Sequence, residues 1–330
     1  MNGTTAVTLS GSNASIKVGQ IIYGTSIATD TYVAAISGTA LTLSKVASGS
    51  STSTLSFNTP HGVVVGGGNN QATGSYSFIG GGGDAGTAAN RNVASGDWSF
   101  VGGGRLNQAT GAGSAILGGG TDGTSTAGNT ASGPTSAVLG GNNNNASGTE
   151  SVVVGGSSNL ANGNRSIVVG ATNGTTRGIV GNTVMPASIS PFSLQGGSQS
   201  ALLILGKQTT DATATVLTSN TAGAGGTNQA IMPNNSAYTF VVTVIAGKTA
   251  AGDTKSWELK GAIKRGANAA STAIVGTVTT TVIATDAGAA TWAITATADT
   301  TNGGLAITVT GQAATTIRWV AKVETTEMQF

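Results

Sequence analysis

The chain has 330 residues and a net charge of +2, and only 8% of its residues are charged, against about 25% in an ordinary soluble domain. Glycine contributes 53 residues, cysteine is absent and histidine occurs once, at His61. These values exclude a disulfide framework, a thiolate nucleophile and a metal site built from several histidines or cysteines. The sparse lysine and arginine exclude a nucleic-acid binder. The apolar runs are shorter than the roughly 20 residues that span a bilayer, so we expect no membrane insertion.

Residues 1–60 are expected to form a small N-terminal β module for attachment or capping. Apolar runs separated by turns rich in glycine or serine predict strands. The runs lie at residues 6–9, 20–23, 32–36, 41–43 and 55–57. The segment 18–24, followed by Tyr32, Ile36 and the run at 41–44, resembles a small β module that recurs in phage virion proteins.

Residues 61–185 carry an internal repeat. An anchor serine recurs at intervals of 22, 15, 22, 15 and 15 residues, at Ser77, Ser99, Ser114, Ser136, Ser151 and Ser166. The unit is therefore 15 residues long, and two units hold an insertion of 7 residues, near 82–90 and 121–128. Each unit has a β-branched residue two places after its anchor and an asparagine further on. This pattern predicts about seven stacked rungs of a parallel β-roll or β-helix, with the asparagines forming a side-chain ladder.

The short strand of each unit is apolar on both faces, which predicts burial on both faces. The residues one and three places after the anchor pair a large side chain with a small one, as in Phe78 with Gly80 and Phe100 with Gly102. The summed volume stays roughly constant, as in a close-packed interior. We therefore expect these glycines to be required because the phenylalanines occupy the shared space. One face fills the core of the unit, and the other face needs a neighbouring chain.

The units at 146–155 and 161–170 resemble the head repeats of trimeric autotransporter adhesins of the YadA type. The resemblance covers about 120 residues and implies a homotrimeric, left-handed parallel β-roll. A secretion signal, a heptad stalk and a membrane anchor are not seen in the sequence, so we expect a chain made in the host cytoplasm. Similar repeats are frequent in bacteriophage fibres, and that setting is the one we expect.

Residues 186–199, with Pro186 and Pro191, are expected to be a linker, and residues 200–330 a C-terminal antiparallel β-sandwich. Eight strand patterns lie at 201–205, 213–217, 238–246, 256–264, 276–284, 291–297, 305–310 and 316–324. Alternation places Trp257, Trp292 and Trp319 on inward positions. The stretch resembles the distal β-sandwich domains of phage fibres, which makes it the candidate receptor-binding tip.

The sequence predicts no catalytic, cofactor-binding or metal site. His61 has no candidate partner and is interpreted as a residue of the junction between modules. Trp98 immediately precedes an anchor serine, at a variable position expected to be exposed, where an indole can stack on a sugar ring. Asp84 and Asp122 lie in the two insertions and are further ligand-binding candidates. The plainer interpretations are a contact between chains for Trp98 and turn formation for the two aspartates.

These features predict an all-β, non-enzymatic structural protein at the virion surface: a homotrimeric phage tail fibre or spike that projects its sandwich for host-surface adhesion. The expected partners are its own copies, other virion proteins of the tail, neck or capsid, and a host cell-surface glycan. A capsid decoration, head-fibre or neck protein is the alternative. A bacterial surface adhesin, or a glycan-degrading tailspike with paired carboxylates, is a more distant one.

Overall fold

The computed structural model describes residues 3–57, 61–121, 123, 127–189, 191–250 and 252–330. The chain divides into two units, Met1–Ala131 and Ser132–Phe330. Regular structure in the described residues is strand, apart from three single-turn 3-10 helices: η1 (Ala88–Asn90), η2 (Ala269–Ser271) and η3 (Ala287–Ala289). The predicted all-β fold class is confirmed. In this part of the chain, no helix is long and apolar enough to cross a membrane.

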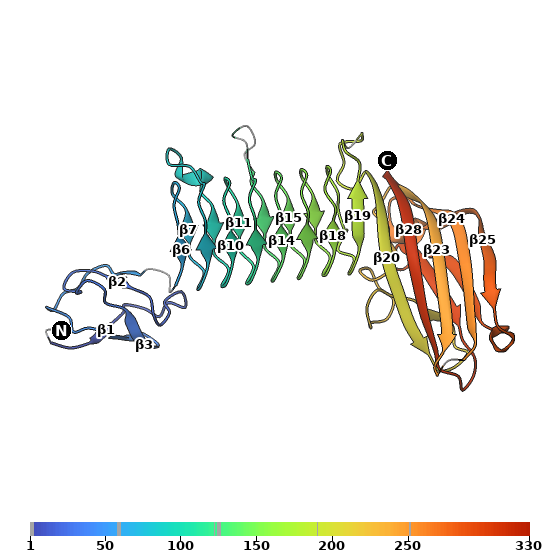
Figure 1. Ribbon diagram of the computed structural model, residues 1–330, viewed down its shortest axis with the longest axis horizontal. Helices are drawn as coiled ribbons and strands as arrows, with labels where there is room; N and C mark the ends of the chain where they lie inside the picture. The colour runs from blue at the N-terminus through green and yellow to red at the C-terminus, as the bar shows by residue number, and fades with distance from the viewer. Residues whose placement is uncertain (1–2, 58–60, 122, 124–126, 190, 251) are drawn as a thin grey trace. The chain divides into compact units, whose positions relative to one another are not determined.

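The N-terminal residues of the first unit form five short strands around a small core (Figure 1). The strands are β1 (Ala6–Thr8), β2 (Ile22–Tyr23), β3 (Val33–Ser37), β4 (Ala40–Leu43) and β5 (Ser56–Phe57). Strands β1, β4 and β3 make an antiparallel sheet, and β2 pairs with β5. Alternation buries Val7, Val33 and Leu41 together. Each strand lies within two residues of its predicted position.

The first unit continues as stacked rungs, each made of two short strands (Figure 1). The first sheet contains β6 (Val63–Val64), β8 (Phe78–Ile79), β10 (Phe100–Val101) and β12 (Ala115–Ile116). The second contains β7 (Gln71–Ala72), β9 (Val93–Ala94), β11 (Gln108–Ala109) and β13 (Thr130–Ala131). These strands pair in parallel within each sheet, and Phe100 is opposite Phe78 on one side and Ala115 on the other. These partners are 22 and 15 residues apart, so the sequence period is the rung period.

The second unit begins with rungs of the same kind. Its strands are β14 (Ala137–Val138), β16 (Val152–Val153), β18 (Ile167–Val168) and β19 (Thr183–Pro186) in one sheet, and β15 (Asn145–Ala146) and β17 (Leu160–Ala161) in the other. Strand β18 pairs in parallel with β19, and β19 pairs antiparallel with β20 (Ser198–Thr209). The sheet of rungs therefore runs directly into the sheet of the sandwich that follows.

Each rung encloses a thin apolar core. The β-branched residue two places after the anchor is fully buried in every repeat. These residues are Ile79, Val101 and Ile116 in the first unit and Val138, Val153 and Val168 in the second. An alanine from the second sheet faces them, also with no exposed surface, as at Ala94 and Ala161. The small alanine leaves room for the larger residue, so each rung is closed with side chains of its own.

The predicted asparagine ladder is confirmed. The side-chain Oδ1 of Asn92 accepts the main-chain N–H of Asn107 at 3.0 Å. Asn107 Nδ2 donates to the carbonyls of Gly103, at 2.8 Å, and Gly119, at 3.0 Å. In the second unit, Asn159 makes three bonds of the same kind. Each buried amide therefore ties its own turn to the neighbouring rung.

Gly80 and Gly102 are small for a different reason from the one predicted. A Cβ on Gly102 would lie 2.3 Å from the carbonyl oxygen of Leu117 and 3.3 Å from the Phe100 ring, and a Cβ on Gly80 would lie 2.5 Å from the Gly102 carbonyl. The main chain of the next rung thus excludes a side chain. The rings of Phe78 and Phe100 stack on each other, with centroids 5.4 Å apart. The expectation that ring volume alone requires these glycines is wrong.

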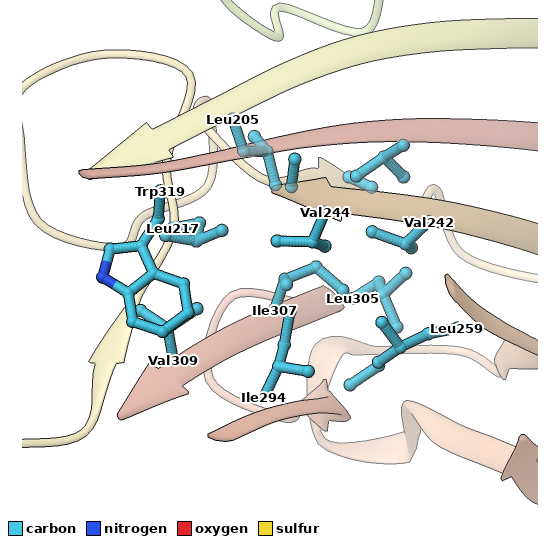
Figure 2. Packing of buried hydrophobic residues seen from close by; sticks show 14 of the residues in the cluster. Leu205, Leu217, Val242, Val244, Leu259, Ile294, Leu305, Ile307, Val309 and Trp319 are labelled. Atoms are coloured by element: carbon cyan, nitrogen blue, oxygen red, sulfur yellow. The ribbon is translucent and has the colours of Figure 1, made fainter. Parts of the chain in front are cut away.

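The C-terminal part of the second unit is an antiparallel sandwich. One sheet contains β20, β28 (Ile317–Gln329), β23 (Ser236–Lys248), β24 (Thr254–Arg265) and β25 (Ala273–Thr285). The other contains β21 (Thr215–Val216), β22 (Ala230–Ile231), β26 (Ala293–Asp299) and β27 (Gly304–Thr310). Figure 2 shows Leu205, Leu217, Val244, Ile307 and Trp319 packed between them. The eight predicted strands are present, and the two-residue β22 is an addition.

The three tryptophans of the sandwich are buried, as the alternation predicts. Trp257, Trp292 and Trp319 are each at most 2% exposed. The Trp257 and Trp319 rings stack with centroids 5.8 Å apart, and Trp292 tilts against Trp319 at 5.9 Å. Their large apolar area stabilises the core, so Trp98 is the tryptophan that remains for surface contacts.

Candidate functional site

Aliphatic side chains lie on the outer face of the first sheet of the rungs in each unit. They belong to the residues three places after the anchor, and we call them the outer stripe: Leu117 in the first unit, and Leu139, Val154 and Val169 in the second. Leu117 is 55% exposed, and the other three are 43–44% exposed. The residue one place after each anchor lies on the same face and is half-buried. Each rung therefore presents apolar surface outward although its own core is complete.

A second surface feature lies at the turn before the anchor position in three rungs of the first unit, where that position is Gly62, Ser77 and Ser99. Consecutive rungs place His61, Tyr76 and Trp98 at this turn, and we call them the aromatic row. The His61 and Tyr76 rings stack with centroids 4.8 Å apart and planes 10° apart. Tyr76 is 57% exposed and Trp98 is 65% exposed. The predicted exposure of Trp98 is confirmed, and the sequence interpretation missed its two neighbours in the row.

The aromatic row occupies left-handed backbone. The φ angles of His61, Tyr76 and Trp98 are 59°, 58° and 56°. On the next rung, Gly113 fills the same place with a φ of 66°. Glycine adopts this conformation without a Cβ clash, whereas other residues lose roughly 1–2 kcal/mol. Main-chain bonds hold the turns in register, because Trp98 N donates to the carbonyl of Ser75 at 2.7 Å.

Asp84, in the first insertion, organises its own loop. Its Oδ1 accepts the main-chain N–H groups of Gly86 and Thr87, and its Oδ2 accepts Asn90 Nδ2 at 3.0 Å. Arg105, from the next rung, forms an ion pair with the same carboxylate at 2.7 Å. Hydrogen bonds from Asn90 and then Gly86 lower the pKa of Asp84 below its ordinary value of 3.8. The carboxylate is therefore committed to loop structure, in line with its turn-forming interpretation.

Asp122, the ligand candidate in the second insertion, lies outside the described residues. Its neighbour Gly123 is described, and a Cβ placed on it would lie 3.0 Å from Arg105 Nη1. The Arg105 side chain thus contacts Asp84 of the first insertion and approaches the second. The sequence interpretation did not single out Arg105, because a contact with a residue 21 positions away leaves no local pattern in the sequence.

The described carboxylates of the rungs already have structural partners. Asp97 Oδ1 accepts the Ser75 main-chain N–H at 2.9 Å. Glu150 pairs with Arg165 at 2.6 Å, on the turns that correspond to the aromatic row in the second unit. Among the described residues, no three His, Asp or Glu side chains lie close enough together to hold a metal ion. What these surfaces offer is apolar contact along the outer stripe and ring stacking along the aromatic row.

No family model matches the chain, and no curated protein matches it. Similar solved structures include the tailspike protein of Acinetobacter baumannii bacteriophage Fri1, a capsular polysaccharide depolymerase, with a TM-score of 0.25, 11% identity, and coverage of 77% of this chain and 48% of that one. The tailspike protein of Acinetobacter baumannii phage AM24 has a TM-score of 0.21, 11% identity, and coverage of 77% and 49%. The chain spans about half the length of these structures. At such low similarity, its function is argued from its own residues.

Proposed function

We propose that the chain is a non-enzymatic structural protein of a bacteriophage virion, a homotrimeric tail fibre or spike whose copies meet along the outer stripe. The rungs act as a rigid spacer between the N-terminal module, which docks to the particle, and the C-terminal sandwich, which contacts the host surface. The likeness of the repeat and of the N-terminal module to phage fibre sequences supports the virion setting.

The outer stripe is the observation that carries the proposal. Val154 and Val169 are more than two-fifths exposed, although each directly follows a paired strand whose last residue is fully buried. Rungs repeat at about 4.8 Å, so Leu139, Val154 and Val169 form a continuous aliphatic surface in the second unit. Monomeric proteins rarely expose contiguous apolar patches larger than a few hundred Å². An identical copy lying alongside presents a stripe of the same period and so covers it rung by rung.

Three parallel copies satisfy the stripe in a closed arrangement. Cyclic symmetry gives every copy the same environment and leaves no open apolar edge for further growth. The number three follows from the resemblance to the trimeric adhesin heads. Three sandwiches on one spacer also give avidity, which offsets weak binding at a single site.

Lysine substitutions in the outer stripe test the proposal. Val154→Lys with Val169→Lys places two charges per copy in the apolar contact, and we expect the assembly to dissociate in sedimentation experiments. Ser147→Lys is the matched control, because Ser147 is exposed beside the second sheet of the same rungs. If the double variant Val154→Lys with Val169→Lys sediments as the wild type does, the outer stripe is not the contact between copies.

The non-enzymatic role and the place on the particle have separate tests. The intact chain is expected to leave the viscosity of bacterial capsular polysaccharide solutions unchanged, and a steady fall in viscosity would contradict this role. Antibodies against residues 200–330 are expected to label the tail tip in images of the particle. Labelling of the capsid or neck would instead support the decoration or neck alternative.

A further inference from the structure

We propose that the aromatic row of His61, Tyr76 and Trp98 is a binding site for the pyranose rings of a bacterial surface polysaccharide. The inference rests on the proposed function, because it assigns the glycan contact of a virion fibre to a particular surface. It adds a second contact with the host to the one expected of the C-terminal sandwich. Capsular polysaccharides and lipopolysaccharide O-chains present the same ring chemistry.

The geometry of the row suits a chain of sugars. Its three residues occupy the same turn of successive rungs, and parallel rungs are about 4.8 Å apart. The planes of the His61 and Tyr76 rings are nearly parallel, 10° apart, and the two rings stack face to face. Trp98 follows on the next rung and is 65% exposed. The row therefore offers a sugar the exposed indole of Trp98 and, on the neighbouring rungs, those parts of the His61–Tyr76 stack that stay exposed.

Folding alone does not explain aromatic residues at these turns. The turn is left-handed whatever residue it holds, because Gly113, Thr135 and Glu150 occupy the same place in later rungs with φ between 53° and 66°. Tyr76 and Trp98 both adopt this conformation while more than half of each side chain stays in solvent. Little apolar burial offsets the backbone cost. Because the turn accepts residues of several kinds, the fold does not require rings here, and the exposed rings are available for contact with a ligand.

The chemistry of the row favours a sugar over a second copy of the chain. A pyranose ring has an apolar face of C–H groups and a rim of hydroxyls, and it pairs with an aromatic ring that has polar groups nearby. The Tyr76 phenol, the half-buried Ser75 and the exposed Asp97 lie at the same turns. The aliphatic side chains available to a second copy lie instead on the strand, in the outer stripe.

Fluorescence quenching in the full chain tests the site directly. Trp257, Trp292 and Trp319 are at most 2% exposed, so a neutral quencher such as acrylamide reaches Trp98. We expect one readily quenched tryptophan, and protection of it by a purified capsular polysaccharide or O-chain from a panel containing both classes. The class that protects identifies the source of the glycan. Two results would overturn the site: a Trp98 that acrylamide does not reach, or no protection by any member of the panel.

Variants separate this site from the proposed assembly. Trp98→Gly places in the row the residue that Gly113 shows to fit the turn, and binding to the protecting polysaccharide should weaken about 3- to 10-fold. Trp98→Tyr should retain most of the affinity. Thr135→Gly, at a turn of the same kind with a φ of 53°, should bind as the wild type does. If Trp98→Gly binds normally, or if it dissociates the assembly, the row is not a glycan site. Failure of the outer stripe would appear instead as a wild-type chain that does not self-associate.

Discussion

At the scale of single residues, the buried asparagine of each rung is a position where the chain tolerates little change. Asn107→Asp keeps an acceptor but loses the donor that serves two carbonyls, which then face a carboxylate. We expect a loss of about 2–4 kcal/mol in the free energy of unfolding, measured by chemical denaturation at pH 7. Asn143→Asp is the control, because Asn143 is exposed and should change stability by less than about 0.5 kcal/mol. Equal losses for both variants would contradict the ladder.

Some residues of the repeat could be assigned their roles from the sequence, and others could not. The interior valines and the asparagine ladder follow from period alone, because each recurs at one place in the rung. The role of Gly102 does not follow from the period, because the closest contact of an added Cβ is a main-chain carbonyl of the next rung. The aromatic row could have been found by aligning the repeats, because Tyr76 and Trp98 occupy the same position in successive units.

At the scale of elements, the first insertion depends on the ionised form of Asp84. Its folded-state pKa lies below 3.8 because Asn90 and Gly86 donate hydrogen bonds to it. The carboxylate therefore stabilises the loop fully above the unfolded-state pKa, and this contribution is lost as the pH falls through the lower folded-state value. We expect amide exchange at Gly86 and Thr87, corrected for intrinsic rates, to accelerate below about pH 4. Asp84→Asn should show fast exchange at both pH values, and a loop insensitive to this change would contradict the assignment.

A buried polar cluster connects the last rung of the second unit to the sandwich. Arg177 forms an ion pair with Glu327 of β28, and both side chains are less than a tenth exposed. Gln199 Nε2 donates to the same carboxylate at 2.8 Å and to the carbonyl of Thr175 at 2.9 Å. Burial lowers the pKa of Arg177, but the charge of Glu327 and other contacts offset this, so the pKa is raised overall. Burial, and then Glu327, raises the pKa of the Tyr238 phenol well above 10.0.

Removing one partner of this pair should destabilise the second unit strongly. Glu327→Ala leaves the Arg177 charge buried and unpaired, and we expect a loss of about 3–5 kcal/mol in the free energy of unfolding. The matched control is Glu324→Ala on the same strand, where the pair with Lys322 is about half exposed and contributes at most about 1 kcal/mol. Similar melting temperatures for the two variants would show that the cluster does not hold the rung to the sandwich.

The strands of the sandwich could be predicted more fully than its connections. Alternating apolar residues located β23, β24 and β28, because inward positions recur every second residue. The pair of Arg177 with Glu327 spans 150 residues, and no local pattern in one chain reports such a contact. Strand β22 has two residues and lies outside the repeat and the predicted apolar runs, so neither signal located it.

At the scale of the whole molecule, the outer stripe couples folding to association between copies. A repeat in which each rung contacts only its neighbours is stabilised by stacking, and its exposed apolar stripe adds stability only when another copy covers it. Folding and association are then coupled, so the melting temperature should rise with protein concentration. The absence of cysteine in the sequence means that this coupling is non-covalent.

The most direct test of the contact along the outer stripe is the mass of the assembly that this chain forms, measured by native mass spectrometry at micromolar concentration. We expect a species of three chains, each of 31.8 kDa, that survives dilution until the copies unfold together. A stable, folded single chain under the same conditions would contradict it, because the outer stripe would then be exposed without a partner.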